Sequence, residues 1–152
     1  MPSDPSSLPP SLRAVVEEFQ RAPTPLKLPL LLDYAKKLPA LEGAARADAT
    51  RRFERVEECQ TPLYVAADTT DGRVTLFFDA PEEAPTTRGF ASILYHGLNG
   101  TTPRDVAAVP ADLSASLGLT TLVSPLRLRG MDGMIRRVKS LVIDHEDATG
   151  LA

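Results

Sequence analysis

The sequence has 152 residues, of which 43% are hydrophobic and 24% charged, and its formal net charge is −3. This length and composition predict one domain with an ordinary hydrophobic core. The lack of a basic excess and an aromatic content of only 5% argue against nucleic-acid binding. No apolar run reaches the length of about 18 residues that a membrane-spanning helix needs. A single cysteine cannot form an internal disulfide, so the sequence does not imply an oxidising compartment.

The N-terminal segment is rich in proline and serine, which predicts disorder over residues 1–10. This segment has neither the basic start nor the apolar stretch of a secretory signal, so we expect a cytoplasmic protein. The rest of the chain is expected to form a folded domain over residues 11–144 and a flexible tail over residues 145–152.

Two amphipathic helices are predicted after the N-terminal segment. The first begins at Ser11, a candidate N-terminal cap, and the second covers residues 26–37, with Pro29 in its first turn and Pro39 beyond its end. The residues expected to face the core are Leu12, Val15, Val16 and Phe19 in the first helix and Leu28, Leu31, Leu32 and Ala35 in the second. Residues 39–51 fit either a short helix or an irregular loop.

Alternating apolar residues then predict an antiparallel hairpin made of residues 63–67 and 73–78. The stretch DTTDGR between them contains Asp-Gly, a strong signal for a tight turn. Pro62 opens the first strand, a position where a missing N–H is tolerated. Cys59 therefore lies in a connecting loop just before this strand.

Helices are predicted for most of the remaining chain. One follows a loop at residues 80–86 and begins near Thr87. The next begins after Thr102, whose side chain is a candidate cap, and a short helix over residues 112–117 ends at Gly118.

A loop is predicted over residues 123–130, followed by a last helix with one apolar side. Its inward residues are expected to be Met131, Met134, Ile135, Val138 and Val142. Its outward residues Arg136, Arg137 and Lys139 are interpreted as a solvated surface. Helices, a small antiparallel sheet and further helices together indicate an α+β domain.

The residues that several common sites require are missing. A structural zinc site takes four Cys or His ligands and an iron–sulfur cluster about four thiolates, whereas the chain has one cysteine and two histidines. We therefore expect no bound metal. The chain has no glycine-rich phosphate loop. A Cys–His hydrolase would need His96 to reach Cys59 through tertiary folding alone, and a surface histidine is the simpler interpretation.

Cys59 follows directly after an acidic pair, Glu57 and Glu58. A lone cysteine is most often a small buried hydrophobic residue. Paired carboxylates are unusual around a core residue, however, and they raise the pKa of a nearby thiol, whose thiolate is the reactive form. The positive charges available to offset this effect are Arg51, Arg52 and Arg55. We hypothesise a thiol that is unreactive in the free protein and activated when a partner docks.

The segment RVEECQTPLYV around Cys59 resembles the Arg-Val-Pro-Gly-Cys-Gln-Ser-x-Val/Leu-Trp stretch of the SufE proteins, the sulfur acceptors of cysteine desulfurases. Three further segments resemble the family in the same order. DYAKKLPAL is similar to Leu-Gly-Lys-Lys-Leu-Pro, RGFASILYHGLNGTTPRDVAA to a run that ends in Gly-x-Thr-Pro, and LGLTTLVSPLRLRGMDGMIRRVK to the tail with Ser-Pro-x-Arg-x-Asn-Gly. The resemblance covers residues 12–139, and the ordered set is more specific than any one segment.

This resemblance implies a persulfide carrier on an α+β fold related to iron–sulfur scaffold proteins of the IscU type. A pyridoxal-phosphate-dependent cysteine desulfurase of the SufS type forms a persulfide, and Cys59 accepts its outer sulfur. The sulfur then passes to an iron–sulfur scaffold complex of the SufBCD type. The resemblance also implies that the carrier stimulates the desulfurase and needs no cofactor of its own. It would act as a sulfurtransferase-like partner more than as a free-standing enzyme, without nucleic-acid or membrane partners.

Three further residues are carried over from the family pattern. Arg127 matches the arginine of Ser-Pro-x-Arg, which implies binding to an acidic desulfurase surface or anchoring of the cysteine loop; a solvated or helix-capping arginine is the simpler alternative. Gln60 matches the family's glutamine, which implies a role in orienting the loop, although a surface amide is nearly as good an interpretation. Glu83 falls where the family often has an aspartate.

The chain also departs from the family pattern. Acidic residues replace a small pair before Cys59, Arg129 replaces an asparagine, and Tyr64 stands for a tryptophan. Thr86 and Thr87 replace apolar residues. A second interpretation is therefore kept: a non-catalytic module that binds a desulfurase or another protein, in which Cys59 has no chemical role. A thiol redox enzyme is disfavoured because the chain has no resolving cysteine.

Overall fold

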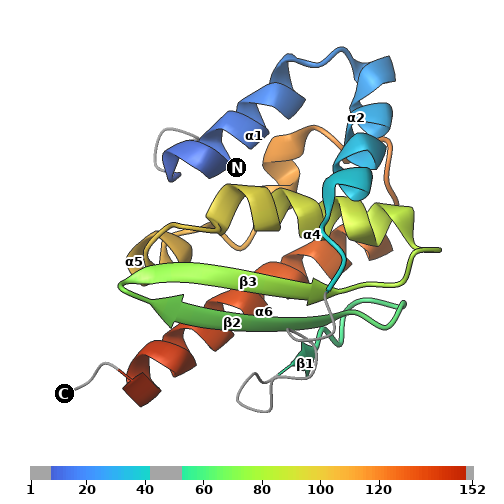
Figure 1. The fold of residues 1–152 in the computed structure, drawn as a ribbon. Helices are drawn as coiled ribbons and strands as arrows, with labels where there is room; N and C mark the ends of the chain where they lie inside the picture. Colours follow the sequence, from blue (N-terminus) through green and yellow to red (C-terminus); the bar gives the residue numbers. More distant parts are fainter. Residues whose placement is uncertain (1–7, 42–52, 150–152) are drawn as a thin grey trace.

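The computed structural model describes residues 8–41 and 53–149 of the chain, and it belongs to the α+β class that the sequence predicts. Figure 1 shows a small sheet with α6 passing behind it and the N-terminal helices on the far side of α4. The elements are, in order, α1 (Pro10–Arg21), α2 (Thr24–Lys37), β1 (Glu54–Arg55), β2 (Tyr64–Thr70), β3 (Arg73–Asp79), α4 (Pro85–Leu98), α5 (Pro103–Ala107), the short 3₁₀-helix η2 (Leu113–Leu117) and α6 (Pro125–Thr149). Among the described helices, none has the length and apolar content needed to cross a membrane.

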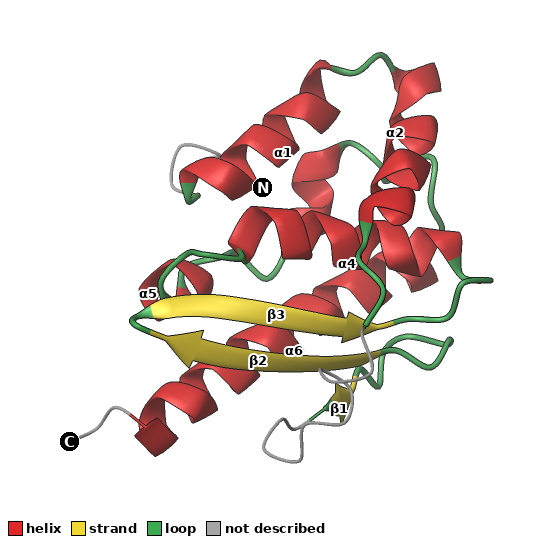
Figure 2. Cartoon of the chain, viewed as in Figure 1, coloured by secondary structure: helices red, strands yellow, loops and turns green. Residues whose placement is uncertain are grey.

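The sheet is antiparallel throughout, with the strand order β1-β2-β3 (Figure 2). The predicted hairpin is confirmed, and its turn is the Asp71-Gly72 pair, whose φ angles of 52° and 74° are both positive. Positive φ at both central residues is the requirement of the tightest hairpin turn and explains the Asp-Gly signal. Strand β1 has only two residues and pairs with the start of β2, so its sequence carries no alternation to detect.

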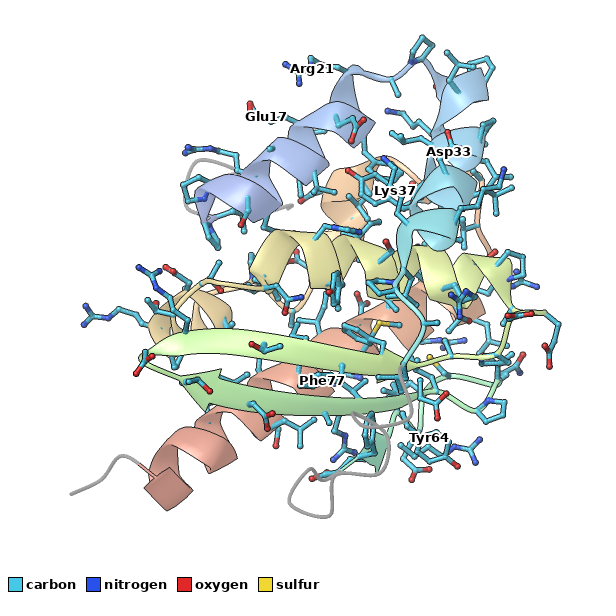
Figure 3. All side chains as sticks on the ribbon, in the orientation of Figure 1. Glu17, Arg21, Asp33, Lys37, Tyr64 and Phe77 are labelled. Atoms are coloured by element: carbon cyan, nitrogen blue, oxygen red, sulfur yellow. The ribbon has the colours of Figure 1, made fainter. Side chains whose placement is uncertain are left out.

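One face of the sheet contributes to the hydrophobic core. Val65 pairs with Phe78, and Ala67 pairs with Leu76, so their side chains share a face and pack against α4 and α6. Tyr64 and Phe77, labelled in Figure 3, lie on the opposite face, and 37% of Tyr64 is exposed.

The first helix has the inward face that the sequence predicts, but the predicted cap is wrong. Pro9 is the N-cap residue, and the Ser11 hydroxyl instead donates to the Gly97 carbonyl of α4 at 2.7 Å. Ser11 thus joins two helices instead of closing one. The predicted disordered segment is also too long, because Leu8 is buried in the core.

The second helix begins two residues earlier than predicted and turns a different face inward. Its buried residues are Lys27, Leu31, Tyr34 and Ala35, while Leu28 and Leu32 are only half-buried. The reason is tertiary: the Lys27 ammonium donates to the Phe19 carbonyl at the end of α1, where it neutralises the negative end of that helix. Pro29 lies inside the helix and not in its first turn.

The last helix begins at Pro125, so the loop predicted over residues 123–130 is wrong. The Ser124 hydroxyl accepts a hydrogen bond from the Arg127 N–H at 3.3 Å, and Pro125 occupies the first helical position, where it is well tolerated. The helix continues to Thr149, into the segment predicted as a tail. The inward face of five apolar residues is confirmed.

Two shorter predictions in the same half of the chain are confirmed. Thr102 and Asp105 form a reciprocal capping box at the start of α5, with both hydrogen bonds at 3.2 Å. Gly118 adopts a φ of 70° after η2, as a helix-terminating glycine does. The helix predicted to begin near Thr87 instead begins at Pro85.

Helix α4 approaches α2 closely at Gly89. A Cβ atom at this position would lie 2.7 Å from the Leu31 carbonyl oxygen and 2.7 Å from Leu31 Cδ1. The backbone oxygen cannot move aside as a side-chain end could, so the missing side chain at Gly89 sets the distance between these helices.

Gly89→Ala is expected to lower the free energy of unfolding by about 1–2 kcal/mol. Overpacking against a backbone oxygen falls in the upper part of the usual cost of about 1–3 kcal/mol, and the better helix propensity of alanine offsets about 1 kcal/mol of it. Urea unfolding followed by circular dichroism measures it. Ser140→Ala, at an exposed position of α6, is the control and should stay within about 0.5 kcal/mol of the parent protein. A Gly89→Ala variant as stable as this control would contradict the close packing.

Candidate functional site

Cys59 lies in the segment between β1 and β2, which we call the Cys59 loop (residues 56–63). The loop is closed at its base by a hydrogen bond from the Val56 N–H to the Leu63 carbonyl at 3.0 Å. Both of these residues are fully buried in the core. Within the loop, the Cys59 N–H donates to the Val56 carbonyl at 3.2 Å. The two ends of the loop are therefore anchored, and Cys59 lies at its centre.

The Cys59 side chain is buried against α6, with 7% of the residue exposed. Its Sγ atom lies 3.7 Å from the Gly130 carbonyl oxygen, within the range of a weak S–H donor. A Cβ atom at Gly130 would lie 3.3 Å from the same Sγ. The absence of a side chain at Gly130 therefore lets the thiol lie directly on the helix backbone.

The surroundings of Cys59 favour the protonated thiol. The pKa of Cys59 is raised to about 11; burial is the largest cause, the charge of Glu58 adds to it, and Arg55 opposes both. The upward direction agrees with the sequence prediction, but that prediction assigned it to the neighbouring carboxylates and not to burial. Arg51 and Arg52, also considered there, lie outside the described residues.

Glu58 itself turns back onto α6. Its carboxylate forms a 2.8 Å ion pair with Arg136, and this hydrogen-bonded contact lowers the pKa of Glu58. The side chain crosses Gly133, where a Cβ atom would lie 2.4 Å from the carboxyl carbon. The carboxylate beside Cys59 is therefore charged at neutral pH and held in place by the helix.

The basic side of α6 makes specific contacts and is not simply the solvated surface that the sequence predicts. Arg137 forms a 2.9 Å ion pair with Glu54 of β1, and the Lys139 ammonium donates to the Val109 carbonyl at 2.6 Å. With Arg136, these residues attach α6 to three different segments of the chain.

A cavity of about 150 Å³ adjoins the Cys59 side chain. It lies between the Cys59 loop, the start of α4 and the start of α6, which are far apart in the sequence. Gln60, Glu83 and Arg127 all line it together with Cys59. The fold thus brings the four residues carried over from the family pattern to one place.

Hydroxyl groups that are not among the predicted site residues join the walls of this cavity. The Arg127 guanidinium donates to the Thr86 hydroxyl at 3.0 Å, which links α6 to α4. The hydroxyls of Thr61 and Thr87 lie 3.2 Å apart and link the Cys59 loop to α4. The sequence feature that could have indicated these hydroxyl contacts is the replacement of the family's apolar residues by Thr86 and Thr87. Phe90 and Leu126 add apolar surface to the same walls.

The described residues do not form the arrangement that a Cys–His hydrolase or a metal site would need. His96 packs edge-on against Tyr34 of α2, and its Nε2 atom lies 3.3 Å from the Lys37 carbonyl oxygen, near the end of α4 remote from the cavity. A Cys–His pair is therefore not formed. In the part of the chain that the structure describes, no three acidic, His or Cys side chains gather in a way that would hold a metal ion.

Comparison with known proteins agrees with the geometry. The family model SufE, described as an Fe-S metabolism associated domain, matches residues 13–142. An uncharacterized SufE-like protein of Mycobacterium tuberculosis is 50% identical over 136 residues, which cover 89% of this chain and 93% of the relative. An uncharacterized SufE-like protein of Synechocystis is 30% identical over 139 residues, which cover 91% of this chain and 84% of the relative.

A solved structure has the same fold. The solution structure of a hypothetical protein from Thermus thermophilus superposes with a TM-score of 0.81 and 38% sequence identity. The alignment covers 92% of this chain and 98% of that one. Because the family model spans most of the chain and relatives match over nearly their whole lengths, this protein belongs to the SufE family.

Proposed function

We propose that the protein is a persulfide carrier that takes sulfur from a cysteine desulfurase onto Cys59 and delivers it for iron–sulfur cluster assembly. Family membership associates the chain with iron–sulfur metabolism in general terms. The observation that carries the specific proposal is the position of Cys59, the sole cysteine, beside a cavity lined by Gln60, Glu83 and Arg127.

The proposed chemistry is thiol–persulfide exchange. The Cys59 thiolate attacks the outer sulfur of a persulfide on the desulfurase, a new S–S bond forms on Cys59, and the bond in the donor breaks. The desulfurase cysteine leaves as a thiolate, so no external oxidant or reductant is needed. Delivery repeats the same exchange, with Cys59 as the leaving thiolate and a scaffold thiol as the acceptor.

The geometry supports a carrier that is unreactive when alone. Thiolate is the nucleophile, and the raised pKa of the buried Cys59 makes its thiolate fraction near neutral pH smaller than that of an ordinary cysteine. The anchored ends of the loop allow its centre to move toward a desulfurase without unfolding of the core. The adjoining cavity has room for the additional sulfur atom. We propose that a pyridoxal-phosphate-dependent desulfurase is the donor and that docking is accompanied by exposure of Cys59.

A second function is favoured by one observation, the burial of Cys59 within the core cluster. On this alternative the protein binds a desulfurase or another protein through the same surface, and Cys59 is only a small packed residue. The two functions differ in whether sulfur ever becomes attached to this side chain.

Incubation with a cysteine desulfurase and free cysteine is expected to increase the intact mass of the protein by one sulfur atom. Peptide mapping should place it on Cys59, and a reducing agent should remove it, because the persulfide bond is labile to thiols. Cys59→Ser should gain no mass and should fail to stimulate desulfurase turnover. Stimulation by Cys59→Ser equal to that by the parent protein would favour the binding module instead.

The reaction of Cys59 with iodoacetamide is expected to accelerate with pH up to about 11 in the native protein. In denaturant the same profile should level off near the ordinary thiol pKa of about 8.5. The sign follows from the thiolate fraction: a raised pKa leaves less thiolate at any pH below it. Mass spectrometry of samples quenched at successive times gives both profiles. A native profile that levels off at or below pH 8.5 would show that burial does not control this thiol.

A further inference from the structure

We propose that Glu58 and Arg136 form a latch that holds the Cys59 loop closed on α6 and so sets how often Cys59 is exposed. Both are positioning residues, because they act on the loop and not on the transferred sulfur. The inference extends the proposed function, since an exposed Cys59 matters for transfer, but the latch itself is a property of the isolated chain.

The loop can open at its centre while its ends stay in place. Val56 and Leu63 are fully buried and joined by a hydrogen bond, whereas Glu57, Glu58 and Gln60 are exposed. Opening therefore needs to break only the contacts that the centre of the loop makes with its surroundings.

The contacts of this centre with α6 lie along one line of the helix. Gly130, Gly133 and Arg136 are spaced by three residues and so share a helix face. Cys59 lies on the first, and the Glu58 side chain crosses the second and reaches the third. The two glycines allow the loop to approach the helix backbone closely, and the Arg136 guanidinium binds the Glu58 carboxylate beyond them.

The ion pair is the strongest single contact in this set. Sulfur is a weak hydrogen-bond donor, and the Cys59–Gly130 contact is 3.7 Å long, whereas the Glu58–Arg136 contact is a charge-assisted bond of 2.8 Å. The two side chains are 36% and 54% exposed, so water screens their attraction. Such an exposed pair biases an equilibrium by a factor of about two to five. A docking partner can overcome that bias.

A neighbouring ion pair provides a matched control. Arg137 follows Arg136 directly and pairs with Glu54 at 2.9 Å. Glu54 belongs to β1 and lies outside the Cys59 loop. Substitution of Arg137 breaks the Arg137–Glu54 pair and removes one positive charge from α6, as substitution of Arg136 does, but it leaves the contact between Glu58 and Arg136 intact.

The test measures alkylation of Cys59 by iodoacetamide in the isolated protein at pH 8, followed by intact mass. Arg136→Gln should accelerate the reaction about two- to fivefold, while Arg137→Gln should leave the rate unchanged. The direction is diagnostic. Without Arg136 the Glu58 charge is uncompensated, which raises the thiol pKa and by itself slows alkylation. An acceleration therefore reports opening of the loop.

Two further measurements confirm that the ion pair is responsible. Added salt should accelerate alkylation of the parent protein and have less effect on Arg136→Gln, because screening weakens only an intact pair. Glu58→Gln should also react faster, partly because it removes a charge that raises the thiol pKa. The diagnostic result is that adding Arg136→Gln to it brings no further gain, since both substitutions remove one contact.

Equal rates for the parent protein and both arginine variants would overturn the latch. An equal acceleration in both variants would also overturn it, because it would indicate general loosening of α6. The test needs no desulfurase, so its outcome is separate from sulfur loading. Acceleration without any loading of Cys59 would leave the latch in place and remove the proposed function, and loading without acceleration would do the reverse.

Discussion

The site depends on the close approach of the Cys59 loop to α6, which two glycines make possible. At Gly130 a side chain would press on the thiol, and at Gly133 it would overlap the Glu58 carboxylate. Because both positions lack a side chain, the loop lies directly on the helix, and Cys59 becomes part of the core. The burial that results is the main cause of the raised pKa of Cys59. The raised pKa of the thiol is thus caused by packing first and by charge second.

Charge refines this arrangement in a way that is specific to this chain. Glu58 stands where the family pattern has a small residue, and Arg136 supplies its partner from α6. Without Arg136, the Glu58 carboxylate would still disfavour a Cys59 thiolate, but it would make no ion pair between the loop and α6. With it, the same carboxylate both discourages ionisation of Cys59 and ties the loop to the helix. Under the proposed function, such a thiol would stay unreactive until a sulfur donor is present.

The predictability of each element follows from the range of the interactions that form it. The hairpin, the capping box at Thr102 and the stop at Gly118 depend on residues a few positions apart, and all three are confirmed. The loop predicted over residues 123–130 overlaps the first turns of α6, although Ser124 and Pro125 are a recognisable helix start. The inward face of α2 was partly wrong because Lys27 binds the end of α1, a contact that the helix's own periodicity does not contain.

The sequence by itself determined the class of the fold, the single cysteine and the family, because these depend on local patterns and on the order of motifs along the chain. It also indicated that Cys59 would be hard to ionise, since Glu58 is its neighbour. Only the tertiary structure decided that the thiol is buried, that Arg127 and Glu83 share a cavity with it, and that Glu58 pairs with Arg136. These features depend on contacts of the Cys59 loop with α4 and α6. The spacing of residues along the chain does not show which distant segments come into contact.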